Sequence, residues 1–177
     1  MSDEQPSGIQ ETFISHLIEL RTRLVRASAV VLAVFIVLFL VWPGAAQVYD
    51  FMAQPMMQAL PEGSKMIATG VITPFMVPVK LTMMLALMVS LPWVLYQGWA
   101  FVAPGLYTHE KRLVAPLIIS SSVLFMLGVL FCYFFVFGTV FKFINDFAPK
   151  SISVAPDIEN YLDFVLTMFI AFGVAFE

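Results

Sequence analysis

The sequence predicts an all-α fold, that of a polytopic integral membrane protein with three complete transmembrane helices and the start of a fourth. Of its 177 residues, 60% are hydrophobic and 12% are charged, and the mean hydropathy is +0.92. A water-soluble domain has about 25% charged residues. Because the interior of so small a chain cannot hold this much apolar surface, most of it is expected to contact lipid.

Stretches without any acidic or basic side chain locate the spans. Residues 27–49, 81–108 and 113–141 are free of Asp, Glu, Lys and Arg. Each is long enough to cross a hydrocarbon layer of roughly 30 Å, which takes about 20 apolar residues. A fourth stretch, residues 164–176, is shorter and is interpreted as the first half of a span. The expected spans are residues 27–46, 76–98, 113–138 and 160–177.

The remaining segments complete the expected organisation. Residues 1–26 form an N-terminal amphipathic segment, and residues 27–177 form the transmembrane domain. The outer loops are expected at residues 47–75 and 139–159, and an inner loop at residues 99–112. The first outer loop is expected to carry a short interfacial helix that is broken or started by Pro55, since proline disrupts a helix interior.

The distribution of basic residues predicts that the N-terminus is cytoplasmic. With three complete crossings, one side of the membrane holds five basic residues and the other side holds three. Basic residues concentrate in cytoplasmic loops, which favours the side with five. These are Arg21, Arg23, Arg26, Lys111 and Arg112, against Lys65, Lys142 and Lys150.

The segment HLIELRTRL, residues 16–24, contains an acid among basic residues ahead of the first span. At 100° per residue, its apolar side chains form one helical stripe and Glu19 lies on the opposite face. The segment therefore predicts an amphipathic helix on, or running into, the membrane surface. Two interpretations of Glu19 remain open. It forms an ion pair with Arg23 one turn away, worth a few tenths of a kcal/mol, or it receives a cation from outside the protein.

A second acid has the same setting. Glu110 lies in FVAPGLYTHEKRLVAP, residues 101–116, which joins the second and third spans on the side of the N-terminus. A solvated loop charge is the simple interpretation. The alternative is that two carboxylates on one face bind a cationic peptide, because guanidinium groups form planar, bidentate contacts with carboxylates.

Glu177 follows the apolar stretch MFIAFGVAF. An ionisable residue within a span is a candidate functional residue, so a proton-coupled secondary transporter that uses this carboxylate is an alternative function. No internal repeat supports that alternative. The sequence offers no placed nucleophile and base, no set of metal ligands and no basic cluster for nucleic acid, so we expect no enzymatic activity, cofactor, metal or nucleic-acid partner.

Three motifs together resemble the TatC family, the receptor subunit of the twin-arginine protein translocase. They are SHLIELRTRL, YQGWAFVAPGLYTHEKRLVAPL and FGVAFE, and the resemblance runs from about residue 13 to residue 177. It implies a six-helix, glove-like fold with both ends in the cytoplasm, of which this chain would be a piece truncated within span four. It also implies a core receptor that binds the twin-arginine signal peptides of folded substrates at the cytoplasmic face and organises their transport.

The resemblance also implies roles for individual residues. Glu19 and Glu110 match the two acids that accept the arginine guanidinium groups of the signal peptide. Phe101 and Leu106 match apolar positions that contact the same peptide. Arg21, in the first motif, is expected to orient the site or fix its helix.

Two further positions lie deeper in the membrane by this resemblance. Tyr133 matches a polar position on the concave face in a supporting role, and Glu177 matches an acid within span four. The family's partners are TatB, TatA, folded substrates with twin-arginine signal peptides and membrane lipid, with further copies of the receptor in a homo-oligomer. The implied location is the bacterial cytoplasmic (inner) membrane.

Overall fold

The computed structural model describes residues 7–61, 63–102, 111–147, 149 and 155–177. All regular elements in these ranges are helices, and one isolated bridge joins Ile67 to Asp157. This confirms the all-α prediction. The elements are α1 (Ser7–Ile36) continuing into the π-helix η1 (Val37–Val41), α2 (Ala45–Ala59), α3 (Thr73–Val89), α4 (Leu91–Val102), α5 (Lys111–Phe131) continuing through the π-helix η3 (Cys132–Val136) into α6 (Phe137–Phe147), and α7 (Ile158–Ala175).

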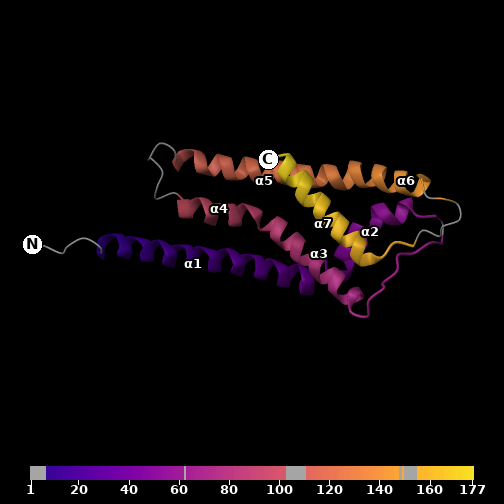
Figure 1. Ribbon diagram of the computed structural model, residues 1–177, viewed down its shortest axis with the longest axis horizontal. Coiled ribbons are helices and arrows are strands. Elements are labelled where there is room, and N and C mark those ends of the chain that lie inside the picture. The colour runs from indigo at the N-terminus through magenta and orange to yellow at the C-terminus, as the bar shows by residue number, and fades with distance from the viewer. Residues whose placement is uncertain (1–6, 62, 103–110, 148, 150–154) are drawn as a thin grey trace, which may run out of the picture.

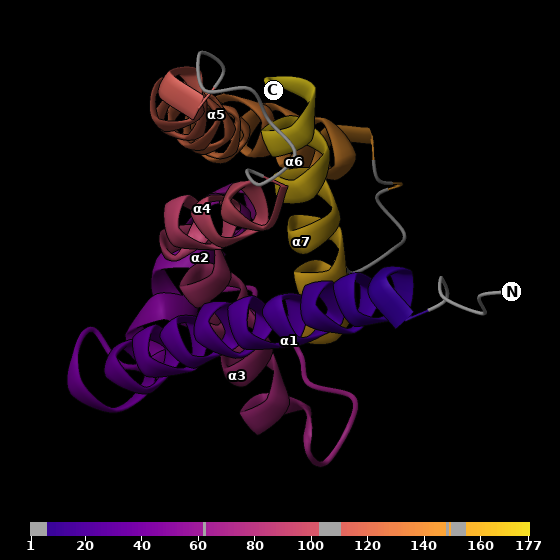
Figure 2. The same ribbon diagram turned by 90° about the vertical axis from the view of Figure 1, so that its left-hand side faces the viewer.

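The helices form an elongated bundle. In Figure 1, α1 and the continuous helix from α5 to α6 run along the long axis, with α3 and α4 between them. The start of α1, the end of α4 and the start of α5 lie at one end of the molecule, and α2, α6 and the start of α7 lie toward the other. Figure 2, seen along the bundle, shows α7 rising beside α4 toward α5.

Several helices are long and apolar enough to cross a membrane. Among the described residues these are Ile14–Val41, Leu113–Phe147 and Ile158–Ala175, and α3 with α4 qualifies as one further span bent by 56°. The bend follows from Pro92 in the first turn of α4, because proline lacks an N–H and its ring collides with the carbonyl four residues earlier, here that of Met88. The polytopic membrane fold is thereby confirmed.

The first helix, α1, begins well before residues 27–49, the charge-free stretch from which the first span was predicted. It is continuous from Ser7, so the amphipathic segment and the first span are one rod. The predicted apolar stripe faces outward, with Ile18 60% and Leu24 64% exposed, whereas Glu19 and Arg23 are half-buried. Apolar faces turn outward when the surroundings are lipid, although where the membrane surfaces cross this helix stays a prediction.

The last helix is also longer than its charge-free stretch. It begins at Ile158, and Glu159 and Asp163 lie in its first two turns. Counting only uncharged residues therefore underestimates α7, which reaches 18 residues and meets the length and composition of a span. Charged side chains near a helix end can reach polar surroundings without ending the helix.

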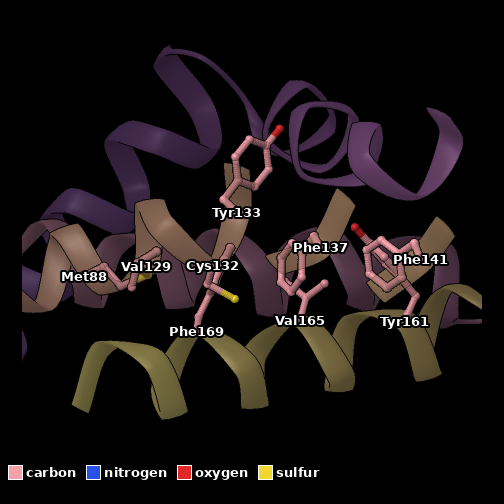
Figure 3. Packing of buried hydrophobic residues seen from close by; sticks show 9 residues of the cluster. All are labelled: Met88, Val129, Cys132, Tyr133, Phe137, Phe141, Tyr161, Val165 and Phe169. Atoms are coloured by element: carbon pink, nitrogen blue, oxygen red, sulfur yellow. The ribbon is translucent and has the colours of Figure 1, made fainter. Parts of the chain in front are cut away.

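The core lies where η3 and α6 face α7. Figure 3 shows Cys132, Phe137 and Val165 between these elements, and all three are fully buried. Aromatic rings dominate the contact, with the Phe137 and Phe169 ring centroids 5.3 Å apart. Large rings supply much buried area per residue, so this layer fixes α7 against the α5–α6 helix.

Two glycines allow α5 and α7 to cross closely. A Cβ atom at Gly128 in α5 would collide with the backbone carbonyl of Phe172 in α7, and one at Gly173 in α7 would collide with the ring of Phe125 in α5. Membrane helices approach most closely where small residues face each other. The position of α7 therefore depends on the absence of side chains at these two residues.

The short helix α2 does not break at its proline. The expectation that Pro55 breaks or starts the helix is wrong, because α2 runs through it from Ala45 to Ala59. Proline leaves the carbonyl four residues earlier without its amide donor, and the Tyr133 hydroxyl donates to that carbonyl, of Phe51, at 2.7 Å. The Tyr161 hydroxyl donates to the adjacent Met52 carbonyl at 2.6 Å. The Tyr133 side chain of η3 thus replaces the bond that Pro55 removes, and the Tyr161 side chain of α7 adds a bond to the neighbouring carbonyl.

An acid joins the segment between α2 and α3 to the start of α7. Asp157 caps the helix by accepting bonds from the amides of Glu159 and Asn160, and it also accepts bonds from the amide and hydroxyl of Thr69. Ile67 exchanges two backbone hydrogen bonds with the residues on either side of Asp157. The loop and the helix start are therefore one connected unit.

This arrangement predicts an acid-sensitive contribution to stability. The hydroxyl bond from Thr69, followed by the amide bond from Asn160, holds the pKa of the Asp157 carboxyl below its ordinary value of 3.8. A lowered folded-state pKa gives stability that is present above the unfolded value and is lost as pH falls through the folded value. Asp157→Ala should therefore lower the unfolding temperature at neutral pH, and the difference from the unchanged protein should shrink in acid.

The measurement is thermal unfolding in detergent across a pH series. Asp146→Ala is the matched control, because Asp146 is an exposed acid in α6. Equal unfolding temperatures for the Asp157 variant and the unchanged protein at neutral pH would contradict a role for this acid in stability.

Candidate functional site

The first part of the site is an ion pair on the half-buried face of α1. The Arg23 guanidinium donates to one carboxylate oxygen of Glu19, with Nη2 at 2.5 Å and Nε at 2.9 Å. The side chain of Glu19 is 33% exposed and that of Arg23 is 23% exposed. The local pairing that the sequence left open is therefore present. Both donors reach the same oxygen, so the second carboxylate oxygen has no partner in this pair.

An aromatic contact lies one turn before Glu19. The rings of His16 in α1 and Phe101 in α4 stack with centroids 4.2 Å apart and planes inclined by 26°. Phe101 is half-buried. The contact joins the polar end of α1 to the end of α4, and so it places a residue from the first motif beside a residue from the second.

Two predicted site residues lie outside the described residues. These are Leu106 and Glu110. The elements on either side of them are described: α4 ends at Val102 and α5 begins at Lys111, at the end of the molecule where α1 begins (Figure 1). The structure therefore tests neither residue, and both remain proposals.

The supporting residues have different surroundings. Arg21 is exposed on α1. Tyr133 is buried, its ring stacks on that of Phe51 with centroids 5.1 Å apart, and its hydroxyl bonds to the Phe51 carbonyl. Its contacts with Phe51 therefore attach η3 to α2. The expectation that Tyr133 is a polar position on the concave face stays a prediction.

Glu177 lies far from the ion pair of α1. It is exposed at the end of the described chain and directly follows Phe176, whose ring lies 5.6 Å from that of Phe131, the last residue of α5. Figure 1 shows this end of α7 part-way along the α5–α6 helix rather than at either end of the bundle. Glu177 and the acid of α1 therefore do not form one site in this structure.

At the polar end of α1, the Glu19 carboxylate is an anion whose present partner, Arg23, can be displaced by another cation. Exposed or half-exposed i,i+4 ion pairs contribute about 0.3–0.5 kcal/mol. An incoming guanidinium with better geometry can therefore replace Arg23 at little cost, or it can use the carboxylate oxygen that Arg23 does not contact. The stacked rings beside it provide an apolar border.

Sequence reasoning missed the contribution of His16. It predicted the apolar stripe of α1 but not which face would meet α4. The available signal was the helical spacing of His16, Glu19 and Arg23, which places polar side chains along one side of the helix. In the described ranges no group of His, Cys, Asp and Glu could hold a metal ion.

The fold and these residues define a class: a polytopic helical membrane protein with a carboxylate and an aromatic contact at one end of the bundle. The model of the family described as Sec-independent protein translocase protein (TatC) matches residues 15–177. The chain belongs to the TatC family.

Individual relatives agree with this assignment. The chain is similar to the Sec-independent protein translocase protein TatC of Haemophilus influenzae, with 47% identity over 97% of this chain and 66% of that protein. It is equally similar to the TatC protein of Escherichia coli (strain K12), with 47% identity over 100% of this chain and 65% of the relative. The chain therefore spans about two thirds of the length of these relatives.

A solved structure agrees as well. A crystal structure of the twin-arginine translocase receptor TatC matches with a TM-score of 0.77 and 35% identity, over 92% of this chain and 70% of that one. The match extends the family assignment from the sequence to the arrangement of the helices.

Proposed function

We propose that this chain is the signal-peptide-binding part of a twin-arginine translocation receptor in the bacterial inner membrane, with its N-terminus in the cytoplasm. The observation that carries the proposal is the Glu19 carboxylate, held on the half-buried face of α1 by a weak, local partner and bordered by the His16–Phe101 contact. The names of the relatives and of the matching structure support it. The protein acts as a receptor and not as an enzyme.

Recognition then depends on exchange of one guanidinium for another. The first or second arginine of the peptide replaces Arg23 on Glu19, and Glu110 receives the other arginine. Phe101 and Leu106 contact the apolar residues near the arginine pair, and Arg21 orients the end of the helix. Bonds to charged groups contribute about 1.5–3 kcal/mol each, which is enough to select arginine and weak enough to allow release.

The partners proposed are those of the translocase: TatB beside the receptor, TatA recruited on demand, folded substrates with twin-arginine signal peptides and further copies of the receptor. Tyr133 supports the fold from which this assembly is built. Glu177 is proposed as a polar group part-way across the membrane. The transporter alternative receives no support from the relatives, which are described as protein translocase components.

The test is photocrosslinking of a twin-arginine peptide to the full-length protein in membrane vesicles. Glu19→Gln should reduce crosslinking about tenfold or more, since a bond to a charged group is worth about 1.5–3 kcal/mol. Glu110→Gln should act in the same direction. A twin-lysine peptide should crosslink poorly even to the unchanged protein, because lysine cannot form the planar fork.

The structure supplies the matched control. Arg23→Gln removes the local partner and leaves the Glu19 carboxylate free, so crosslinking should stay equal or increase. A loss as large as that of Glu19→Gln would mean that Glu19 acts only through its pair with Arg23. Asp50→Asn, at an acid in α2, should leave crosslinking unchanged.

A further inference from the structure

An apolar cavity lies within the bundle, and none of its lining residues belongs to α1. It is lined by residues of α2, α3, the α5–η3 helix and α7, and its volume is about 200 Å³. All its lining residues are hydrophobic, and the lining includes four methionines: Met52, Met84, Met88 and Met126. Apolar cavities of about 150 Å³ stay free of water and accept apolar molecules, and methionine adapts its shape to such occupants.

The cavity borders the outer surface of the bundle. Three of its lining residues are strongly exposed: Phe51 is 48%, Leu130 is 44% and Phe134 is 65% exposed. Leu130 and Phe134 belong to a stretch that is long and apolar enough to span a membrane. An opening bordered by such residues meets acyl chains rather than water.

A polar cleft of about 220 Å³ adjoins this cavity. Tyr133 and Phe134 line both spaces, and the cleft is further lined by Gln54, Gln58 and Lys142. Figure 3 shows Tyr133 directed toward α2, and its hydroxyl is already bonded to Phe51 there. The tyrosine therefore separates the two spaces. Because its hydroxyl donates to Phe51, it does not donate to the side chains of Gln54 and Gln58 in the cleft.

Lys142 gives the cleft its charge. It is exposed, and among the described residues it has neither a hydrogen-bond partner nor an ion-pair partner. It is also the first charged residue after the uncharged residues 113–141. Lysines at such positions reach the headgroup layer with the ammonium while their stem stays in apolar surroundings.

We propose that the cavity and the cleft together bind one anionic phospholipid. One acyl chain enters the methionine-lined cavity, and the phosphate contacts the Lys142 ammonium and the amides of Gln54 and Gln58. An apolar cavity beside a cationic, amide-lined cleft, with Tyr133 and Phe134 lining both, matches the two chemically different parts of this ligand. Charge complementarity favours an anionic headgroup over a zwitterionic one.

The experiment uses the full-length protein in nanodiscs that contain a trace of phosphatidylglycerol or phosphatidylcholine carrying a diazirine at the acyl-chain end. After irradiation, mass spectrometry maps the adducts. Phosphatidylglycerol adducts should concentrate at Met84 and Met126, at least about threefold above those of phosphatidylcholine. Adducts spread evenly over exposed residues such as Leu113 and Ile119 would overturn the proposal.

Two variants separate the parts of the site. Lys142→Gln should abolish the preference for phosphatidylglycerol, while Lys65→Gln, at an exposed lysine outside the cleft, should retain it. Leu85→Phe fills the cavity and should reduce adducts of both lipids, while Leu87→Phe, at an exposed position of the same helix, should not. Equal adduct yields in the paired variants would overturn the proposal, provided that unfolding temperatures without added lipid are unchanged.

Two competitors distinguish the source of the occupant. Soluble glycerol phosphate should not reduce the adducts, because it lacks the acyl chain. A twin-arginine signal peptide added in excess should leave them unchanged. Loss of adducts with either competitor would assign the space to a soluble phosphate or to the apolar part of the peptide and would overturn the lipid site.

Discussion

Replacement of Gly128 by alanine is expected to destabilise the bundle by about 2–3 kcal/mol, at the upper end of the usual cost of overpacking. The new Cβ would meet the carbonyl of Phe172, which belongs to the backbone of α7 and cannot turn aside as a side chain can. The helices must therefore separate, and the aromatic layer beside the crossing loses contact. Thermal unfolding in detergent measures the effect.

The order of effects among glycines checks the mechanism. Gly173→Ala should cost less than Gly128→Ala, because its Cβ meets the ring of Phe125, and a ring can rotate. Gly98→Ala in α4 has open space around its Cβ and should be neutral or stabilise the helix by up to about 1 kcal/mol. If the Gly128→Ala and Gly98→Ala variants have equal unfolding temperatures, the close approach of α5 and α7 at Gly128 does not stabilise the position of α7.

The second large effect is expected at the proline of α2. Tyr133→Phe leaves the Phe51 carbonyl without its donor, at a cost of about 1–3 kcal/mol. Tyr161→Phe should cost less, because the Met52 carbonyl can still accept the amide of Met56 one turn later. Tyr96→Phe, at an exposed tyrosine of α4, is the neutral control. Chemical unfolding in detergent provides the comparison.

A double-mutant cycle isolates the cause. Pro55→Ala restores an amide that can bond to the Phe51 carbonyl, so Tyr133→Phe should cost less in that background than in the unchanged protein. The coupling measures how far the tyrosine substitutes for the missing amide. Additive effects would show that Tyr133 stabilises the bundle through its ring alone.

Several features were predictable from the sequence because they depend on composition and spacing along one helix. The lack of charges over 81–108 and 113–141 requires apolar surroundings, and this predicted the membrane fold. The spacing of Glu19 and Arg23 made their ion pair one of the two interpretations that the sequence left open, since residues four apart on a helix are neighbours. The three motifs carried the family resemblance and with it the proposal of a receptor function.

Other features needed the tertiary structure because they depend on which elements meet. The local sequence around Tyr133 does not reveal that its hydroxyl donates to the Phe51 carbonyl, which lacks an amide donor because of Pro55. Phe51 and Pro55 are distant from Tyr133 in the sequence. The contact of His16 with Phe101 depends on the side of α1 that faces α4. A periodic pattern predicts that a helix has two faces but not which neighbour each face meets.

By itself the sequence determined the class of the protein, the apolar stretches that lie in its spans, and its family, because hydrophobicity, helical period and motif are local properties of the chain. Only the tertiary structure decided that Gly128 and Gly173 bring α5 and α7 together, and that the cavity beside Met84 adjoins the cleft of Lys142. These properties arise from the packing of segments that are distant in sequence. Shape complementarity between such segments is not encoded in the pattern of either one alone.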